Sequence, residues 1–233
     1  MLLRGFDVSA LVDPSADPQP LDDTDLSLMR RAGADVVRVP VTWAGLEPQP
    51  GRFDAGYVDR VAALVARCAA HGLAVVLDMH FLGWSGSYAG QSGAPAWATV
   101  PGIPDAELGL GAFGKYVSPA VNTDLAVFWL TAAWQQQLLQ AWRFLAGRLR
   151  GDSDVAGYDL YNEPHPSPIP PVIFDKRFLW PFYQRAIDAI GAVDPNHLFI
   201  VEGLLLEDFG TTIVPLRAPN LVYSPHLYAG SLV

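Results

Sequence analysis

The most informative segment of the chain reads Tyr158-Asp159-Leu160-Tyr161-Asn162-Glu163-Pro164. Residues 155–160 have the length and apolar character of a short buried strand, because a Gly-Asp turn precedes them and a proline follows. Pro164 cannot donate a ladder hydrogen bond, so it ends the strand just beyond Glu163. The carboxyl ends of the strands carry the catalytic groups of an α/β barrel. The segment therefore predicts Asn162 and Glu163 at the mouth of such a barrel; the alternative is a glutamate that only caps a loop.

Composition limits the classes of protein to which the chain can belong. It has 233 residues, of which 51% are hydrophobic and 17% charged, as expected of a globular domain with its own core. Fifteen Lys and Arg against 24 Asp and Glu give a net charge of −9, which argues against nucleic-acid binding. No apolar run approaches the roughly 18 to 20 residues of a membrane span. Cys68 is the only cysteine, which excludes intrachain disulfides and cysteine-based zinc sites.

The first residues, Met1 to Gly5, are too short and abrupt for a signal peptide. The compartment therefore stays open, with an extracellular location expected if an upstream segment is missing. The sequence gives no indication of the oligomeric state.

Apolar strand-like segments alternate with helical ones along the whole chain. The predicted strands are 2–8, 36–41, 74–80, 155–160, 198–202 and 221–224. The predicted helices are 24–32, 55–70, 125–149 and 178–192, with a weak one at 209–216. The long aromatic segment 81–122 lacks a clear periodicity and is expected to form a lid or binding wall, or else a surface insertion. This alternation predicts the α/β class and a TIM (β/α)8 barrel, with about six of eight βα units in one incomplete domain, 1–233.

Polar residues stand out inside two of these apolar segments. Arg38 lies within a predicted strand and needs an anionic partner, because a lone buried guanidinium is very costly. Asp78 and His80 have the same parity, so both side chains point to one face of their strand. Such residues are poor core material, and they predict a functional site, although a purely structural pairing of Asp78 is an open alternative.

The polar motifs at successive strand ends form an ordered set. They are Arg38, Asp78-Met79-His80, Asn162-Glu163-Pro164 and His226-Leu227-Tyr228. Together they resemble glycoside hydrolase family 5, a clan A family of retaining β-glycosidases built on the TIM barrel. Residues 93–99 and 158–164 look most like the endoglycoceramidase-related branch, whose members cleave glycosylated lipids. The resemblance implies a cofactor-free hydrolase whose substrate is a glycolipid or a β-glucan-type oligosaccharide.

The resemblance also implies a role for each residue of the set. Glu163 would be the general acid/base, and Asn162 would contact the sugar 2-hydroxyl. Arg38 would hold the nucleophilic carboxylate ionised and oriented. The remaining expected substrate-site residues are His80 and His226 along the cleavage subsite, Tyr228 beside the nucleophile, and Trp84 and Trp97 as sugar or lipid platforms.

Two departures from the family pattern matter. Phe81-Leu82 follow Asp-Met-His where the branch has Gln-Asp, and this leaves the glycan specificity open. The nucleophile of the family is a glutamate at the end of a seventh strand, so the chain is expected to stop before it. Glu202 is a weak substitute, because it ends the fifth strand rather than lying across the barrel, and Glu47 is weaker still.

Two other classes of function compete with the hydrolase. A missing nucleophile favours a protein that binds carbohydrate without cleaving it. A metal-dependent hydrolase could use His80, His226 and nearby carboxylates, but no close-spaced ligand motif supports it, and no metal is expected.

Overall fold

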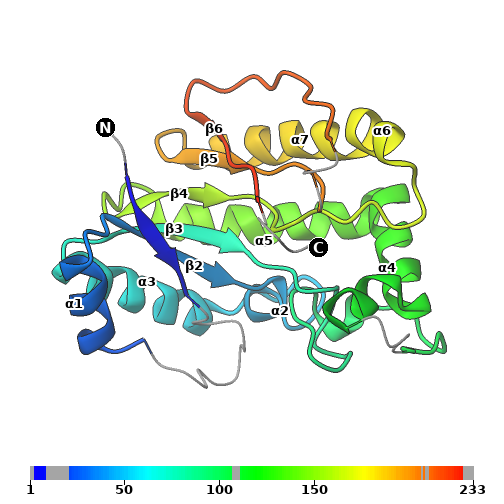
Figure 1. The fold of residues 1–233 in the computed structure, drawn as a ribbon, viewed down its shortest axis with the longest axis horizontal. Coiled ribbons are helices and arrows are strands. Elements are labelled where there is room, and N and C mark those ends of the chain that lie inside the picture. Colours follow the sequence, from blue (N-terminus) through cyan, green and yellow to red (C-terminus); the bar gives the residue numbers. More distant parts are fainter. Residues whose placement is uncertain (1–2, 9–20, 107–110, 206, 208–209, 228–233) are drawn as a thin grey trace.

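The computed structural model describes residues 3–8, 21–106, 111–205, 207 and 210–227. Its centre is one sheet of six parallel strands that neighbour each other in the order in which they occur along the chain. The strands are β1 (Gly5–Asp7), β2 (Val36–Val41), β3 (Ala74–Met79), β4 (Val155–Asp159), β5 (Leu198–Val201) and β6 (Leu221–Tyr223). In Figure 1 the arrowheads of β2, β3 and β4 point toward the same side of the molecule, where α4 lies. The carboxyl ends of these strands therefore share one end of the sheet, as predicted.

Helices connect the successive strands from β1 to β5 and pack side by side behind the sheet (Figure 1), whereas the described part of the connection from β5 to β6 has no α-helix. The α-helices are α1 (Asp23–Arg31), α2 (Trp43–Leu46), α3 (Ala55–Ala70), α4 (Pro119–Leu130), α5 (Ala132–Leu149), α6 (Pro171–Phe174) and α7 (Trp180–Gly191). Three further helical elements are η1 (Ala96–Ala98), η2 (Gly111–Val117) and the π-helical η3 (Asp175–Leu179), which joins α6 to α7. The alternation of strand and helix agrees with the predicted series of βα units.

Local sequence signals set the ends of the first helices. Asp22 caps α1 by accepting from the Asp25 backbone N–H at 2.8 Å, and the Asp25 carboxylate accepts from Asp22 in return. Asp54 caps α3 in a similar way, through the Tyr57 N–H. Gly72 follows α3 with φ +73°, a conformation that glycine adopts without strain. The predicted bounds of α3 match the observed helix.

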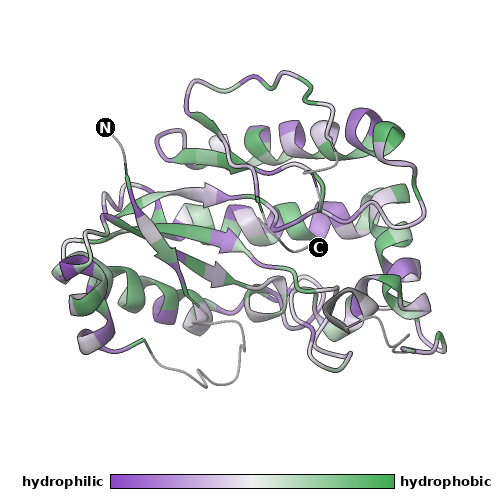
Figure 2. Cartoon of the chain, viewed as in Figure 1, coloured by the Kyte–Doolittle hydropathy of each residue, from purple (hydrophilic) through white to green (hydrophobic). Residues whose placement is uncertain are grey.

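The core lies between the sheet and these helices. Figure 2 shows β2, β3 and β5 coloured mainly as hydrophobic, with polar residues near the ends of strands. Val37, Val39, Leu77 and Met79 are at most 1% exposed and share one parity, so the face of β2 and β3 that carries them is fully covered. An aromatic cluster continues this core beyond the ends of β3 and β4, where Phe81 stacks on Tyr161 at 4.2 Å.

Three segments differ from the prediction. The expected helix 125–149 is two helices, because Thr131 has extended backbone angles (φ −122°, ψ 151°) that separate α4 from α5. The expected loop 81–122 contains η1, η2 and the start of α4. The weak helix expected at 209–216 is wrong for its described part, since 210–216 has no helical residue.

Candidate active site

Arg38 on β2 is the centre of a cluster of charged side chains at the carboxyl end of the sheet. Its guanidinium forms ion pairs with four carboxylates that come from four other parts of the sheet. The partners and distances are Asp7 at 3.1 Å and Asp78, Asp159 and Glu202 at 2.9 Å each. The prediction that Arg38 requires an anionic partner is confirmed. These carboxylates all lie within the chain, whereas the family resemblance implied a nucleophile from a seventh strand.

Burial strengthens the interactions inside the Arg38 cluster. Asp78, Asp159 and Glu202 have side chains that are at most 1% exposed, and Arg38 is 17% exposed. Burial opposes the charge of Arg38, but the surrounding carboxylates outweigh it and raise the pKa of the guanidinium further. Burial, together with the charges of Glu202 and Asp78, raises the pKa of Asp159 well above its usual range. The cluster therefore places a carboxyl group with a raised pKa beside an always-charged arginine.

Glu163 follows β4 in a backbone conformation that non-glycine residues seldom adopt, with φ +46°. Its backbone N–H donates to Glu202 Oε2 at 2.6 Å. Such strained positions persist only when the surroundings hold them, and they concentrate at functional sites. Glu202 therefore holds the main chain of Glu163 in place, and it does so from the neighbouring strand β5.

His226, just after β6, connects Glu163 with Glu202. Its Nδ1 lies 3.1 Å from Glu163 Oε1, and its Nε2 lies 2.9 Å from Glu202 Oε1. Burial opposes the charged form of His226, but the hydrogen bonds to Glu163 and Glu202 outweigh it and raise the pKa of His226 to about 10. A doubly protonated imidazole can donate to both carboxylates at once.

The raised pKa of His226 predicts how stability depends on pH. Because the folded-state pKa of about 10 exceeds the reference value of 6.5, the His226 contribution is fully present below pH 6.5 and is lost as the pH rises through about 10. We expect the free energy of unfolding to fall across this window in urea titrations. His226→Asn should flatten that slope, and an unchanged slope in the variant would contradict the assignment.

Asn162 precedes Glu163, and its side chain is hydrogen-bonded to Arg38 on β2 and to the segment that follows β3. Its side-chain oxygen accepts from Arg38 at 3.0 Å, and its side-chain nitrogen donates to the Phe81 carbonyl at 3.0 Å. The residue is 4% exposed. These two hydrogen bonds fix the positions of the side-chain oxygen and nitrogen of Asn162, so the amide is oriented before any ligand is present.

His80 lies at the end of β3 and contacts Asp78, the residue of like parity. His80 Nδ1 is 2.7 Å from Asp78 Oδ2. Burial opposes protonation of His80, yet the hydrogen bond and charge of Asp78 prevail and raise its pKa. Asp78 also forms an ion pair with Arg38. Asp78 therefore has a structural ion-pair partner and, at the same time, a contact with the candidate site residue His80.

The two predicted tryptophan platforms have different surroundings. Trp84 is 0% exposed, its ring is stacked between Phe81 and Trp134, and its Nε1 donates to the Ala98 carbonyl. No face of that ring is open to a ligand, so the structure corrects the expectation for Trp84: it is a core residue. Trp97 is partly exposed and donates to the Glu47 carbonyl, and its role stays a prediction. Tyr228 lies outside the described residues.

Several residues of the site were not singled out from the sequence. Asp159 was detectable by the signal that marked Arg38, a charged residue inside an apolar strand. Tyr116 stacks on His165 at 5.3 Å, and burial and the charge of Glu163 raise the pKa of its hydroxyl to about 12. Tyr116 comes from the long segment after β3, where no sequence pattern pointed to it. Glu207 accepts from the His226 backbone N–H at 2.5 Å.

The described part of the chain offers neither a metal-binding cluster nor a membrane-spanning helix. No group of three or more His, Cys, Asp or Glu side chains there has an arrangement suited to a metal ion. None of the helices described is both long enough and apolar enough to cross a bilayer.

Comparison with known proteins places this geometry in context. The family model described as "Cellulase (glycosyl hydrolase family 5)" matches residues 4–232. The chain is 29% identical over 244 residues to endoglycoceramidase I of Rhodococcus hoagii (strain 103S), which covers 93% of the chain. A solved endogalactoceramidase is 36% identical over 99% of the chain, with a TM-score of 0.88. The ganglioside GM3 complex of endo-glycoceramidase II from Rhodococcus sp. is 30% identical, with a TM-score of 0.87.

The chain spans about half the length of these relatives. It covers 48% of the Rhodococcus hoagii protein, 56% of the endogalactoceramidase chain and 57% of the GM3 complex chain.

Proposed function

Because the chain belongs to glycosyl hydrolase family 5, we propose that it carries the acid/base half of the active site of a retaining β-glycosidase that acts on glycolipids. The proposal depends above all on Glu163, whose unusual backbone conformation is held by a hydrogen bond to Glu202. Its carboxylate is 12% exposed at the carboxyl end of β4, its main chain is fixed by Glu202, and its side chain contacts His226. A carboxyl group fixed in this way can reach a bound ligand while its surroundings stay unchanged.

In the proposed reaction Glu163 transfers a proton in both steps. It first protonates the oxygen of the leaving group and later takes a proton from the water that hydrolyses the glycosyl-enzyme. A group that donates a proton must first hold one, so Glu163 has to be protonated before the first step. Asn162 is proposed to hydrogen-bond the sugar, and Arg38, His80 and His226 to line the subsite around it.

Glu202 is not proposed as the nucleophile. Its Oε1 accepts from Arg38 and His226, its Oε2 accepts from the Glu163 N–H, and its side chain is 1% exposed. A retaining site needs a second carboxyl group about 5 to 5.5 Å from the acid/base, with a free lone pair toward the sugar. We therefore propose that the nucleophile is a carboxylate on a seventh strand, and that residues 1–233 form one incomplete barrel domain.

The choice of a glycolipid rests on the relatives rather than on the apolar residues after β3. Phe81 is 2% exposed and stacks between Tyr161 and Trp84, so its apolar ring serves the core. The names of the similar proteins support a sugar–ceramide linkage. A β-glucan-type oligosaccharide is the other substrate class considered.

The test compares the chain alone with the chain extended by the coding sequence that follows Val233. Both are assayed on an aryl β-glucoside and on a fluorescent glucosylceramide. NMR follows the anomeric configuration of the released sugar. We expect turnover with retention by the extended protein and almost none by the chain alone. Robust turnover by the chain alone would locate the nucleophile within it, and an inverted product would exclude the retaining mechanism. Sugar binding without turnover in the extended protein would favour a non-catalytic binding protein.

A further inference from the structure

Three apolar side chains are exposed together where α4 meets α6. Leu130 is 61% exposed, Val172 is 62% and Ile173 is 47%. Leu130 and Ile173 are next in sequence to Trp129 and Phe174, whose rings contact each other at 4.8 Å. Contiguous exposed apolar side chains on a soluble domain mark interaction sites more often than isolated ones do.

Basic side chains border these apolar residues. Lys176 and Arg177 are exposed and lie on η3, which continues directly from the end of α6 that carries Val172 and Ile173. Arg185 lies further along the same continuous helical segment, on α7. Within the described residues none of these three cations forms an ion pair. We call Leu130, Val172, Ile173, Lys176, Arg177 and Arg185 the basic–apolar patch.

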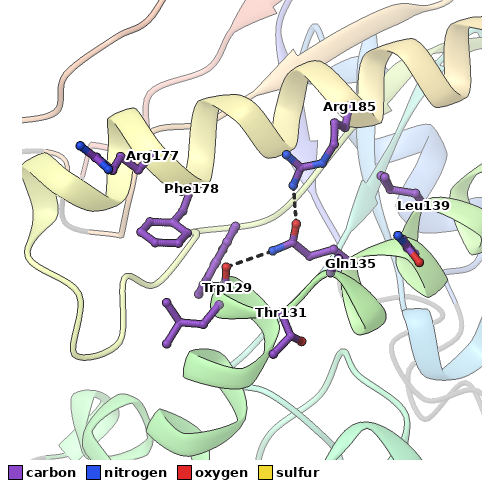
Figure 3. A pocket seen from close by; sticks show the side chains of 10 residues that line it. Trp129, Thr131, Gln135, Leu139, Arg177, Phe178 and Arg185 are labelled. Atoms are coloured by element: carbon purple, nitrogen blue, oxygen red, sulfur yellow. Dashed lines mark hydrogen bonds between the residues drawn. The ribbon is translucent and has the colours of Figure 1, made fainter.

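A pocket of about 410 Å³ adjoins the basic–apolar patch, and the patch residues Leu130, Arg177 and Arg185 line it. Arg177, Phe178 and Arg185 line it from one side, and Trp129, Thr131 and Gln135 from the other (Figure 3). The guanidinium of Arg185 donates to the side-chain oxygen of Gln135, a neutral partner. Burial lowers the pKa of Arg185 because no carboxylate offsets the loss of water around it. The pocket thus combines apolar walls with uncompensated positive charge.

We propose that the basic–apolar patch docks the protein on the surface of an anionic lipid bilayer. Apolar side chains of this size enter the interface between headgroups and acyl chains, while neighbouring Lys and Arg side chains bind lipid phosphates and carboxylates. The chain as a whole carries a net charge of −9, so an anionic surface repels most of it and attracts this patch. Charge complementarity therefore selects a bilayer over an apolar partner, and it also sets the orientation of docking.

The basic–apolar patch is connected to the candidate active site. Trp129 Nε1 donates to the His165 carbonyl at 2.9 Å, and His165 lies two residues after Glu163. In Figure 1 the strand arrowheads point toward the side of α4, so the patch and the site share an end of the sheet. The inference deepens the proposed function and rests on it, since an enzyme that cleaves a glycolipid has to reach a substrate anchored in a bilayer.

The experiment measures sedimentation of the 233-residue chain with vesicles of phosphatidylcholine alone or mixed with phosphatidylserine. We expect binding to the mixed vesicles that decreases with added salt. Lys176→Glu combined with Arg177→Glu should weaken it by about tenfold or more. Val172→Ser combined with Ile173→Ser should weaken it as well. The matched control is Leu28→Ser with Arg31→Glu on α1, which changes an equally exposed apolar residue and a cation outside the patch.

Equal vesicle binding by the patch variants and the control variant would overturn the inference, as would the absence of binding to anionic vesicles. Dimerisation that depends on the patch, seen by analytical ultracentrifugation, would assign this surface to a second copy of the chain and also overturn it. Vesicle binding requires no turnover, so its failure is separate from failure of the proposed hydrolysis. In the extended protein, the patch variants should keep their activity on a soluble aryl β-glucoside and lose it on vesicle-bound glucosylceramide.

Discussion

Glu163→Gln in the extended protein is expected to lower kcat/KM for a glycolipid by about 10²- to 10⁴-fold. Glutamine keeps the shape of the side chain and its contact distance to His226, but it has no proton to transfer to a leaving oxygen. A ceramide alcohol is a poor leaving group and depends on that proton. Steady-state hydrolysis of fluorescent glucosylceramide measures the loss.

A second substrate, an aryl glucoside whose leaving group is an acidic phenol, distinguishes loss of proton transfer from loss of structure in the Glu163 variant. Such a leaving group departs with little protonation, and kcat/KM reports only the first step of the reaction, so Glu163→Gln should lose much less on this substrate. Equal losses on both substrates would contradict the assignment of Glu163 as the acid. Urea unfolding of the variant checks that the fold is unchanged.

Arg38→Met is expected to lower the free energy of unfolding of the chain by about 3 to 5 kcal/mol. Methionine fills a similar volume, but it removes the cation that the buried Asp78, Asp159 and Glu202 share. The cost is that of buried carboxyl groups that have lost their common cation rather than of lost packing. Urea denaturation followed by circular dichroism measures it.

Arg30→Met is the matched control for the Arg38 substitution. Arg30 pairs with Asp35 at 2.8 Å, but both side chains are at least 40% exposed, so its loss should cost no more than about 1 kcal/mol. Lowering the pH should reduce the deficit of Arg38→Met, because protonation removes the unpaired charges. Similar losses in the two variants at neutral pH would show that the Arg38 cluster contributes little.

Periodicity and turn residues predicted much of the fold. Strand β2 and helix α3 have the predicted bounds, since apolar runs and capping residues mark both. The break between α4 and α5 was missed because Thr131 is neither glycine nor proline, and packing of the two helices decides it. The six-strand order followed from the alternation of βα units.

The candidate site was predictable in its members and less so in their contacts. A charged residue in an apolar strand requires a partner, which identified Arg38 and Asp78. Which carboxylates surround Arg38 depends on how the strands lie next to each other, and no local pattern specifies that. The burial of Trp84 was missed for the same reason, because the rings that cover it come from Phe81 and from Trp134 on α5.

The order of the sheet has a consequence for how the chain folds during synthesis. Each new strand pairs with the one made just before it, so the sheet can grow at one edge as residues leave the ribosome. The partners of Arg38 arrive in the same sequence, first Asp7, then Asp78 and Asp159, and finally Glu202. β1, β3, β4 and the end of β5 thus each contribute one carboxylate that pairs with the arginine of β2. A strand that pairs out of register leaves its buried carboxylate without Arg38 as a partner. The Arg38 cluster therefore disfavours incorrect strand pairing during assembly of the sheet.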